Sequence, residues 1–171
     1  MVPHEVFSSC AGAAIYRKSV FDEIGLFDES FFAYLEDMDI GYRARLAGYR
    51  NLYNPYAKVY HLGSASSGSR HNAFKVELSA RNSMYMLRKN MPAWQMVLNV
   101  PFIAAGIIIK TVYFARKGLV KAYLKGIIKG LSGKLRNTSK NAGGKHKDTS
   151  FATYLGLQMW LFRGLVKRVK K

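Results

Sequence analysis

Three carboxylates stand within four residues, at Glu36, Asp37 and Asp39. Acidic residues favour the first turn of a helix because they offset the positive end of its dipole, and Asp39 is spaced to pair with Arg43 on the helix surface. An aromatic-rich segment over residues 26–35 directly precedes the cluster. Because apolar neighbours can desolvate a carboxylate and tune it as a general base, the cluster has a structural and a catalytic interpretation.

A histidine, His61, is the second candidate for chemistry. It follows an expected strand and stands beside a Gly/Ser-rich loop over residues 62–72. Loops at strand ends often carry ligand contacts, although a single histidine is also commonly structural. The chain has one cysteine, Cys10, which excludes a disulfide framework and a cysteine-based zinc site.

The elements that would position these residues are short. We expect one strand or two short strands over residues 6–17, a short helix from Ser19 that ends at Gly25, a helix over residues 36–47 that stops at Gly48, and two short strands within residues 49–61. This order is typical of an α/β or α+β layer.

The second half of the chain predicts helices. One helix is expected over residues 73–90. Residues 93–109 are the most apolar stretch, interrupted by Gln95, Asn99 and Pro101. Because a clean membrane span needs about 20 apolar residues, three alternatives stay open: a transmembrane helix, an interfacial or hairpin-like insertion, which we favour, and a buried core helix.

Charge is distributed unevenly along the chain. The net charge is +17, residues 1–77 carry 8 basic and 9 acidic side chains, and residues 78–171 carry 19 basic and one acidic. Within residues 118–136 lysines recur four apart, opposite an apolar side. Residues 137–149 are typical of a linker, and residues 151–171 end in a basic cluster. Basic amphipathic helices lie in the headgroup plane of anionic bilayers. An anionic membrane surface is therefore favoured over nucleic acid, for which no binding motif is present, and a merely solvated surface is the simple alternative.

Several ordered pieces of the first half occur together. They are residues 12–17 (GAAIYR), 24–32 (IGLFDESFF), 36–39 (EDMD) with Arg43, 47–48 (AG), 59–64 (VYHLGS) and 81–82 (RN). Over residues 6–92 this pattern resembles the second half of glycosyltransferase family 2 enzymes, in particular the rhamnosyltransferase- and galactofuranosyltransferase-like branch. The resemblance implies a GT-A fold, which is a Rossmann-like α/β layer that binds a nucleotide-sugar donor.

The resemblance also implies roles for single residues. Asp37 matches the general base that takes the proton from an acceptor hydroxyl in an inverting transfer. His61 is similar to a histidine that helps to bind a divalent metal, Mn²⁺ or Mg²⁺, on the donor diphosphate. Asp39 and Arg43 resemble supports of the helix start, and phosphate contacts are expected further along. The candidates for substrate binding are Glu36, Asp39, Arg43, Ser64, Arg81 and Asn82.

One part of the family pattern is missing. No Asp-x-Asp motif precedes residue 37, and no Gly-rich phosphate loop opens a helix. We therefore expect the C-terminal piece of a longer enzyme, or a chain that needs a partner with the donor-binding half. The expected division is an acceptor-side half domain over residues 1–92, membrane-associated helices over 93–136, a linker over 137–150 and a basic helix over 151–171.

The expected function is inverting glycosyl transfer from a nucleotide-sugar to a glycan or lipid-linked acceptor in cell-surface polysaccharide synthesis. The expected location is the cytoplasmic face of the cell membrane, with peripheral or monotopic attachment. The alternative is a non-catalytic, membrane-associated remnant or subunit. A basic nucleic-acid-binding protein is the weakest interpretation, because it does not explain the acidic cluster.

Overall fold

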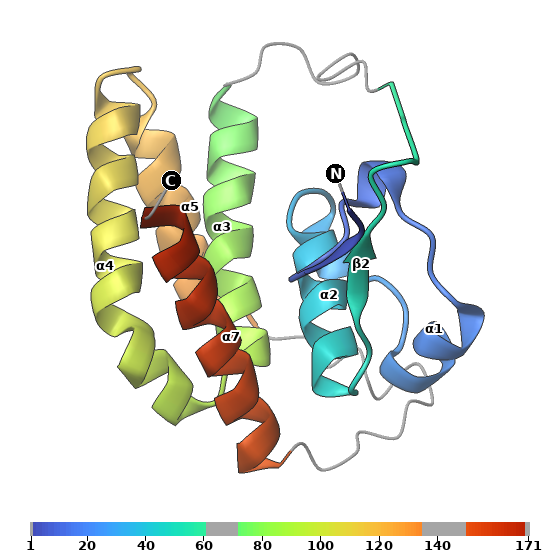
Figure 1. The fold of residues 1–171 in the computed structure, drawn as a ribbon. Helices are drawn as coiled ribbons and strands as arrows, with labels where there is room; N and C mark the ends of the chain where they lie inside the picture. Colours follow the sequence, from blue (N-terminus) through green and yellow to red (C-terminus); the bar gives the residue numbers. More distant parts are fainter. Residues whose placement is uncertain (1, 61–71, 135–149, 170–171) are drawn as a thin grey trace.

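The computed structural model describes residues 2–60, 72–134 and 150–169, with side chains in the last helix as far as residue 164. An N-terminal unit contains β1 (His4–Val6), α1 (Lys18–Ile24), α2 (Glu36–Leu46) and β2 (Asn51–Tyr53), with 3-10 turns η1 (Ala11–Ala13) and η2 (Glu29–Phe31). A helical part follows, with α3 (Ala73–Asn90), α4 (Ala93–Ala115), α5 (Val120–Ser132) and α7 (Phe151–Val169). Figure 1 shows α3 between α4 and the N-terminal unit.

The predicted α/β, Rossmann-like GT-A layer is wrong for the described residues. They are mostly helical, and their sheet is a single antiparallel pair in which Glu5 of β1 faces Leu52 of β2. The expected strand over residues 6–17 is a strand only as far as Val6. Its small residues lie against α2 instead of pairing, since a Cβ added at Gly41 would come within 2.5 Å of the Ser8 Cβ. A run of small residues thus serves a close approach of backbone to helix, not a strand ladder.

The N-terminal unit has its own small core. Val20 and Ile24 of α1 pack with Ile40 and Ala44 of α2. α2 ends close to where the sequence predicts, and Gly48 follows with a φ of +88°, which suits a glycine after a helix.

α3 and α5 pack unusually closely because of two glycines. A Cβ added at Gly126 would lie 2.3 Å from the Glu77 carbonyl oxygen, and one at Gly130 would lie 2.3 Å from the Arg81 carbonyl oxygen. This G-x-x-x-G spacing lets the helix backbones approach, as small residues do in membrane helix pairs. The core between the helices consists of Val76, Ala80, Met84, Tyr123 and Ile127.

α4 is the apolar helix of the chain, and its surface is exposed. It is long and apolar enough to cross a membrane, with a mean hydropathy of 1.8, and none of that window is buried. The buried core helix, one of the three sequence alternatives, is therefore excluded by this structure. The exposed apolar side chains include Val97, Leu98, Val100, Phe102, Ile108, Ile109 and Val112.

The polar interruptions of α4 are paired inside the molecule. Gln95 accepts a hydrogen bond from Tyr42 of α2 (2.8 Å) and donates one to Gln158 of α7 (2.9 Å). Asn99 exchanges hydrogen bonds with the same Gln158. Gln95 and Gln158 are fully buried, so these hydrogen bonds fasten the first part of α4 to α2 and α7.

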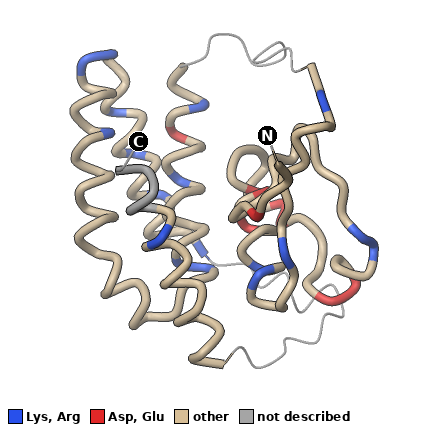
Figure 2. Tube along the Cα trace, viewed as in Figure 1, with Lys and Arg blue, Asp and Glu red and all other residues tan. Residues whose placement is uncertain are grey.

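The lysine stripe predicted on α5 is partly neutralised. Lys129 and Lys125 both pair with Glu77 of α3, at N–O distances of 2.5 and 3.3 Å. Figure 2 shows the other acidic residues of the described chain in the N-terminal unit. These two pairs are exposed at the lysine end, and such surface pairs contribute about 0–1 kcal/mol each.

Candidate functional site

Asp37 stands in the first turn of α2 with its carboxylate half-buried. Its Oδ1 accepts from the backbone N–H of Met38 (2.8 Å), and its Oδ2 accepts from the N–H of Ala11 in η1 (3.2 Å). Ser8 donates to the Asp37 carbonyl (2.6 Å), which holds the segment before η1 across the start of the helix. A carboxylate has about four lone-pair sites, so two backbone donors leave acceptor capacity for a proton or a substrate hydroxyl.

Glu36 directly precedes Asp37, and the charge of Asp37 acts on the Tyr16 phenol. Within the described residues, the Glu36 Oε2 and the Tyr16 hydroxyl are buried and have no hydrogen-bond partner. Burial raises the pKa of the Tyr16 phenol, and the charges of Asp37, Cys10 and Glu36 raise it further. A buried polar atom without a partner costs about 1–3 kcal/mol, which marks these two atoms as candidates for ligand contacts.

A strained loop leads into α2. Phe32, Tyr34 and Leu35 all have φ values between 61° and 70°, which non-glycine residues rarely adopt. Asn82 of α3, which is fully buried, holds the loop because its side-chain nitrogen donates to the carbonyls of Phe31, Ala33 and Tyr34.

Arg81, the neighbour of Asn82 on α3, adds to this anchor. It donates to the Asn82 side-chain oxygen (3.0 Å) and to the carbonyl of Ser30. Backbone strain of this kind persists only where surrounding contacts hold the strained residues in place, and such residues concentrate at functional sites.

Asp39 belongs to a buried ion cluster. It is fully buried and pairs with Arg43 (2.9 Å) and with Lys89 of α3 (3.1 Å), while Asn90 donates to its other oxygen (2.8 Å). Lys89 also bridges to Asp28 (2.7 Å). The predicted Asp39–Arg43 pair is therefore confirmed, but it is buried and not on the helix surface.

Two further groups complete the cluster. Asp28, which also accepts from Tyr85 (3.0 Å), is buried, and burial raises the pKa of its carboxyl. The hydrogen bonds from Lys89 and Ser30 outweigh burial and hold that pKa below its ordinary value. Arg43 donates to the carbonyls of Ile24 and Leu26 at the end of α1. The cluster thus joins α1, α2 and α3.

The structure places the predicted site residues unequally. Glu36 and Asp37 lie together at the start of α2, whereas Arg81 and Asn82 contact the preceding loop. In these positions Arg81 and Asn82 are better suited to position the loop than to bind phosphate. His61 and Ser64 lie outside the described residues, and the substrate and metal roles assigned to all of these residues stay predictions.

Some residues around the site escaped the sequence interpretation. Ser8 and Gly41 are found by no local pattern, and Tyr16 reads as an ordinary residue of a strand. Lys89 lies in the last turn of α3, where a lysine is an ordinary residue of a helix end, so the sequence did not indicate that it is buried against two carboxylates.

No metal site is visible in the described part of the chain. Residues 2–60, 72–134 and 150–169 contain no group of three His, Cys, Asp or Glu side chains close enough to hold an ion. His61, the ligand that the resemblance implies, lies outside the described residues, and the chemistry below is derived without a metal ion.

Part of the chain is similar to a glycosyltransferase. The relative is the N-acetylglucosaminyl-diphospho-decaprenol L-rhamnosyltransferase of Mycobacterium tuberculosis, 43% identical over 54 residues, which are 32% of this chain and 18% of that protein. An uncharacterized protein of Sinorhizobium fredii is 32% identical over 80 residues, or 46% of this chain and 9% of that protein. No family model and no solved structure matches the chain. The chain therefore spans less than a fifth of the length of these curated relatives. The similarity to the rhamnosyltransferase supports the expected resemblance only in its general form, that of a glycosyltransferase.

Proposed function

We propose that this chain is the acceptor-side segment of a family 2-type glycosyltransferase, with Asp37 as the general base of an inverting transfer. The observation that carries the proposal is the geometry of Asp37, a half-buried carboxylate that two backbone N–H groups orient and that follows a strained loop. The partial similarity to the mycobacterial rhamnosyltransferase supports the reaction class.

The proposed step is a single displacement. The Asp37 carboxylate accepts the proton of an acceptor hydroxyl while that oxygen forms its bond to the anomeric carbon of the donor sugar. The bond from that carbon to the nucleotide diphosphate breaks with its electron pair, so the diphosphate leaves and the centre inverts. Glu36 and Tyr16 each have a buried polar atom near this carboxylate, and we assign them to contacts with the acceptor hydroxyls.

The nucleotide-sugar donor needs more than these residues. We assign its binding to a donor half supplied by a longer form of the protein or by a partner chain. A divalent ion, Mn²⁺ or Mg²⁺, would neutralise the diphosphate charge, and His61 is the ligand that we propose for it. No step above depends on that ion.

We also propose that the chain works at the cytoplasmic face of the cell membrane, on a glycan or lipid-linked acceptor of cell-surface polysaccharide synthesis. The exposed apolar surface of α4 supports membrane contact, and the basic residues of the helical part suit an anionic leaflet.

The test is Asp37→Asn in the longest natural form of the protein, assayed for transfer to a lipid-linked acceptor. We expect the rate to fall by about 10²–10⁴-fold, because general base catalysis is worth that much. The circular dichroism spectrum and thermal midpoint should stay unchanged. Asp22→Asn, on the exposed surface of α1, is the matched control and should keep full activity. Full activity in Asp37→Asn would reject the assignment.

A further inference from the structure

Two aromatic rings stand exposed beside the loop that leads into α2. Phe32 is 79% exposed, and Phe74, at the start of α3, is 59% exposed. Their ring centroids lie 6.3 Å apart with the planes at 83°. Single exposed apolar residues are ordinary, but two aromatic rings in contact form a patch that a partner can cover.

The backbone holds Phe32 in this exposed place at a cost. Its φ of 61° and ψ of −58° lie outside the regions that residues other than glycine normally adopt. Asn82 fixes the carbonyls of Phe31 and Ala33 on either side, and Arg81 fixes that of Ser30. A glycine would remove the strain, so the fold alone does not explain a phenylalanine here. Strained residues that persist in this way concentrate at ligand sites.

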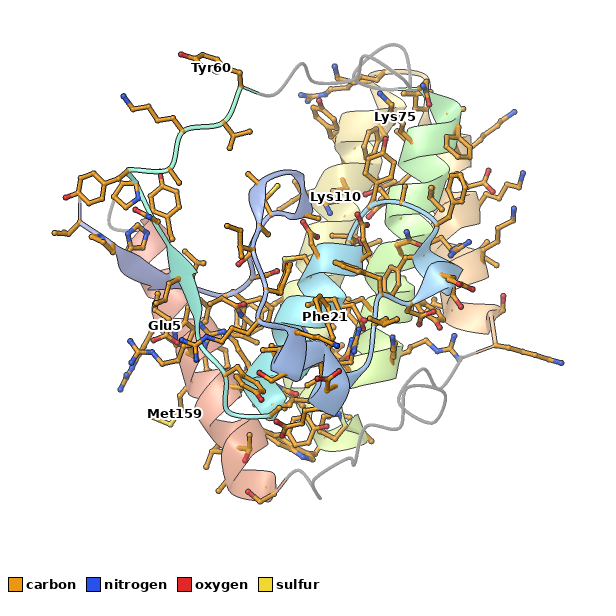
Figure 3. The ribbon with its side chains drawn as sticks, turned by 90° about the vertical axis from the view of Figure 1, so that its right-hand side faces the viewer. Glu5, Phe21, Tyr60, Lys75, Lys110 and Met159 are labelled. Atoms are coloured by element: carbon orange, nitrogen blue, oxygen red, sulfur yellow. The ribbon has the colours of Figure 1, made fainter. Side chains whose placement is uncertain are left out.

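The position of the patch decides between a bilayer and a sugar. α4, whose apolar surface suits a membrane, lies on the far side of α3 from α2. Figure 3 looks onto the side of the N-terminal unit, with α4 behind α3. Phe32 is five residues ahead of Asp37 along the chain, so a partner on its ring should combine an apolar face with hydroxyl groups that reach the carboxylates. A pyranose ring has both, with C–H groups on its face and hydroxyls at its edge.

We propose that Phe32 and Phe74 form an aromatic platform that packs against the face of a pyranose ring of the acceptor. This inference rests on the proposed function, because it places the ring within reach of Glu36 and Asp37. The platform gives apolar contact area at little entropic cost, and the carboxylates accept from the ring hydroxyls. Phe32 is thus a substrate-contact residue.

The test uses the full chain and methyl β-N-acetylglucosaminide, which carries the sugar in the mycobacterial relative's name, titrated by NMR at millimolar concentration. We expect Phe32→Ala and Phe74→Ala to weaken binding about five- to tenfold, which corresponds to about 1–1.4 kcal/mol. Phe32→Trp should retain binding because it keeps an aromatic face. Phe151→Ala, which removes a ring that is 63% exposed on α7, is the matched control and should bind like the wild type.

Phe32→Gly separates binding from folding. It should raise the urea midpoint of unfolding because it removes the strained φ, and it should still weaken sugar binding. Equal sugar binding by the wild type and Phe32→Ala, or no binding by the wild type, would overturn the platform. So would a loss of vesicle flotation in Phe32→Ala with sugar binding unchanged, which would make the patch a membrane contact.

The two proposals fail separately. If Asp37→Asn abolishes transfer but Phe32→Ala binds the sugar as tightly as the wild type, only the platform is wrong. If sugar binding depends on Phe32 but Asp37→Asn transfers normally, only the base is wrong.

Discussion

Replacing Asn82 by aspartate tests whether one side chain holds the strained loop before α2. The two N–H groups of the Asn82 amide are shared among three loop carbonyls at 2.7, 2.8 and 2.9 Å, and the side chain is fully buried. The nitrogen of the amide, and not its oxygen, must face the three carbonyl oxygens, because two acceptors would repel each other. Aspartate keeps the size and shape of the side chain but has no donor when ionised.

The expected loss follows from these contacts. Each buried carbonyl left without a donor costs about 1–3 kcal/mol, so two such carbonyls predict a loss of about 2–6 kcal/mol in the free energy of unfolding. That is a large share of the roughly 5–15 kcal/mol that a folded domain typically has. The three positive φ values should then relax, since the carbonyls of Ala33 and Tyr34 lose the Asn82 donor and, within the described residues, only the Phe31 carbonyl keeps another one, the Ala33 N–H (2.7 Å).

The assay is urea unfolding at pH 7 followed by circular dichroism, for wild type, Asn82→Asp and a control. Asn54→Asp is the matched control, because Asn54 is exposed and uses its oxygen to accept from the Tyr56 N–H (3.0 Å), which a carboxylate does equally well. We expect the control to lie within about 0.5 kcal/mol of the wild type. A loss below about 1 kcal/mol for Asn82→Asp would refute the view that this amide anchors the loop.

Two further predictions concern acid stability and the membrane. Because the pKa of Asp28 is held below its ordinary value in the folded chain, its contribution to stability is present above about pH 4 and is lost as the pH falls through the folded value. Asp28→Asn should therefore flatten the fall in unfolding free energy between about pH 5 and pH 2, measured by urea titration at each pH; an unchanged acid profile would contradict the role of the Lys89 bridge. On α4, Ile108→Lys should weaken flotation with vesicles about tenfold or more, because a lysine in the bilayer costs about 2.5–3.5 kcal/mol. Val2→Lys, at an exposed residue of the N-terminal segment, is the control and should float like the wild type. Equal flotation of both variants would show that α4 does not enter the bilayer.

The sequence predicts the helices better than the sheet. α2 and α3 lie close to the predicted ranges, because Gly48 marks the end of α2 locally and Asn72 caps the start of α3 by accepting from the Lys75 N–H (2.9 Å). The α/β class failed because a run of small residues has two physical uses. Residues 8–14 could have filled a sheet, but the contact of Ser8 with Gly41 uses them as a close-packed strap over α2. No local pattern tells these uses apart.

Long-range polar pairs explain the other differences. Gln95 and Asn99 read as flaws in a membrane helix, but Gln158 on α7 pairs with both. The Asp39–Arg43 pair was predicted from its spacing. Its burial could not be predicted, because Lys89, which also pairs with Asp39, is fifty residues away along the chain. Spacing therefore finds partners within one helix, whereas burial depends on which other helix packs there.

The same distinction separates the carboxylates of the acidic cluster. Asp39 is matched by Arg43, Lys89 and Asn90, so its charge is compensated and its oxygens are occupied. A base must instead be oriented and still have an acceptor site to spare. Asp37 meets that condition, with two backbone N–H donors and a half-buried position. Asp37 and Asp39 are only two residues apart, but Asp39 belongs to the buried ion cluster, whereas Asp37 keeps an acceptor site for the proposed proton transfer.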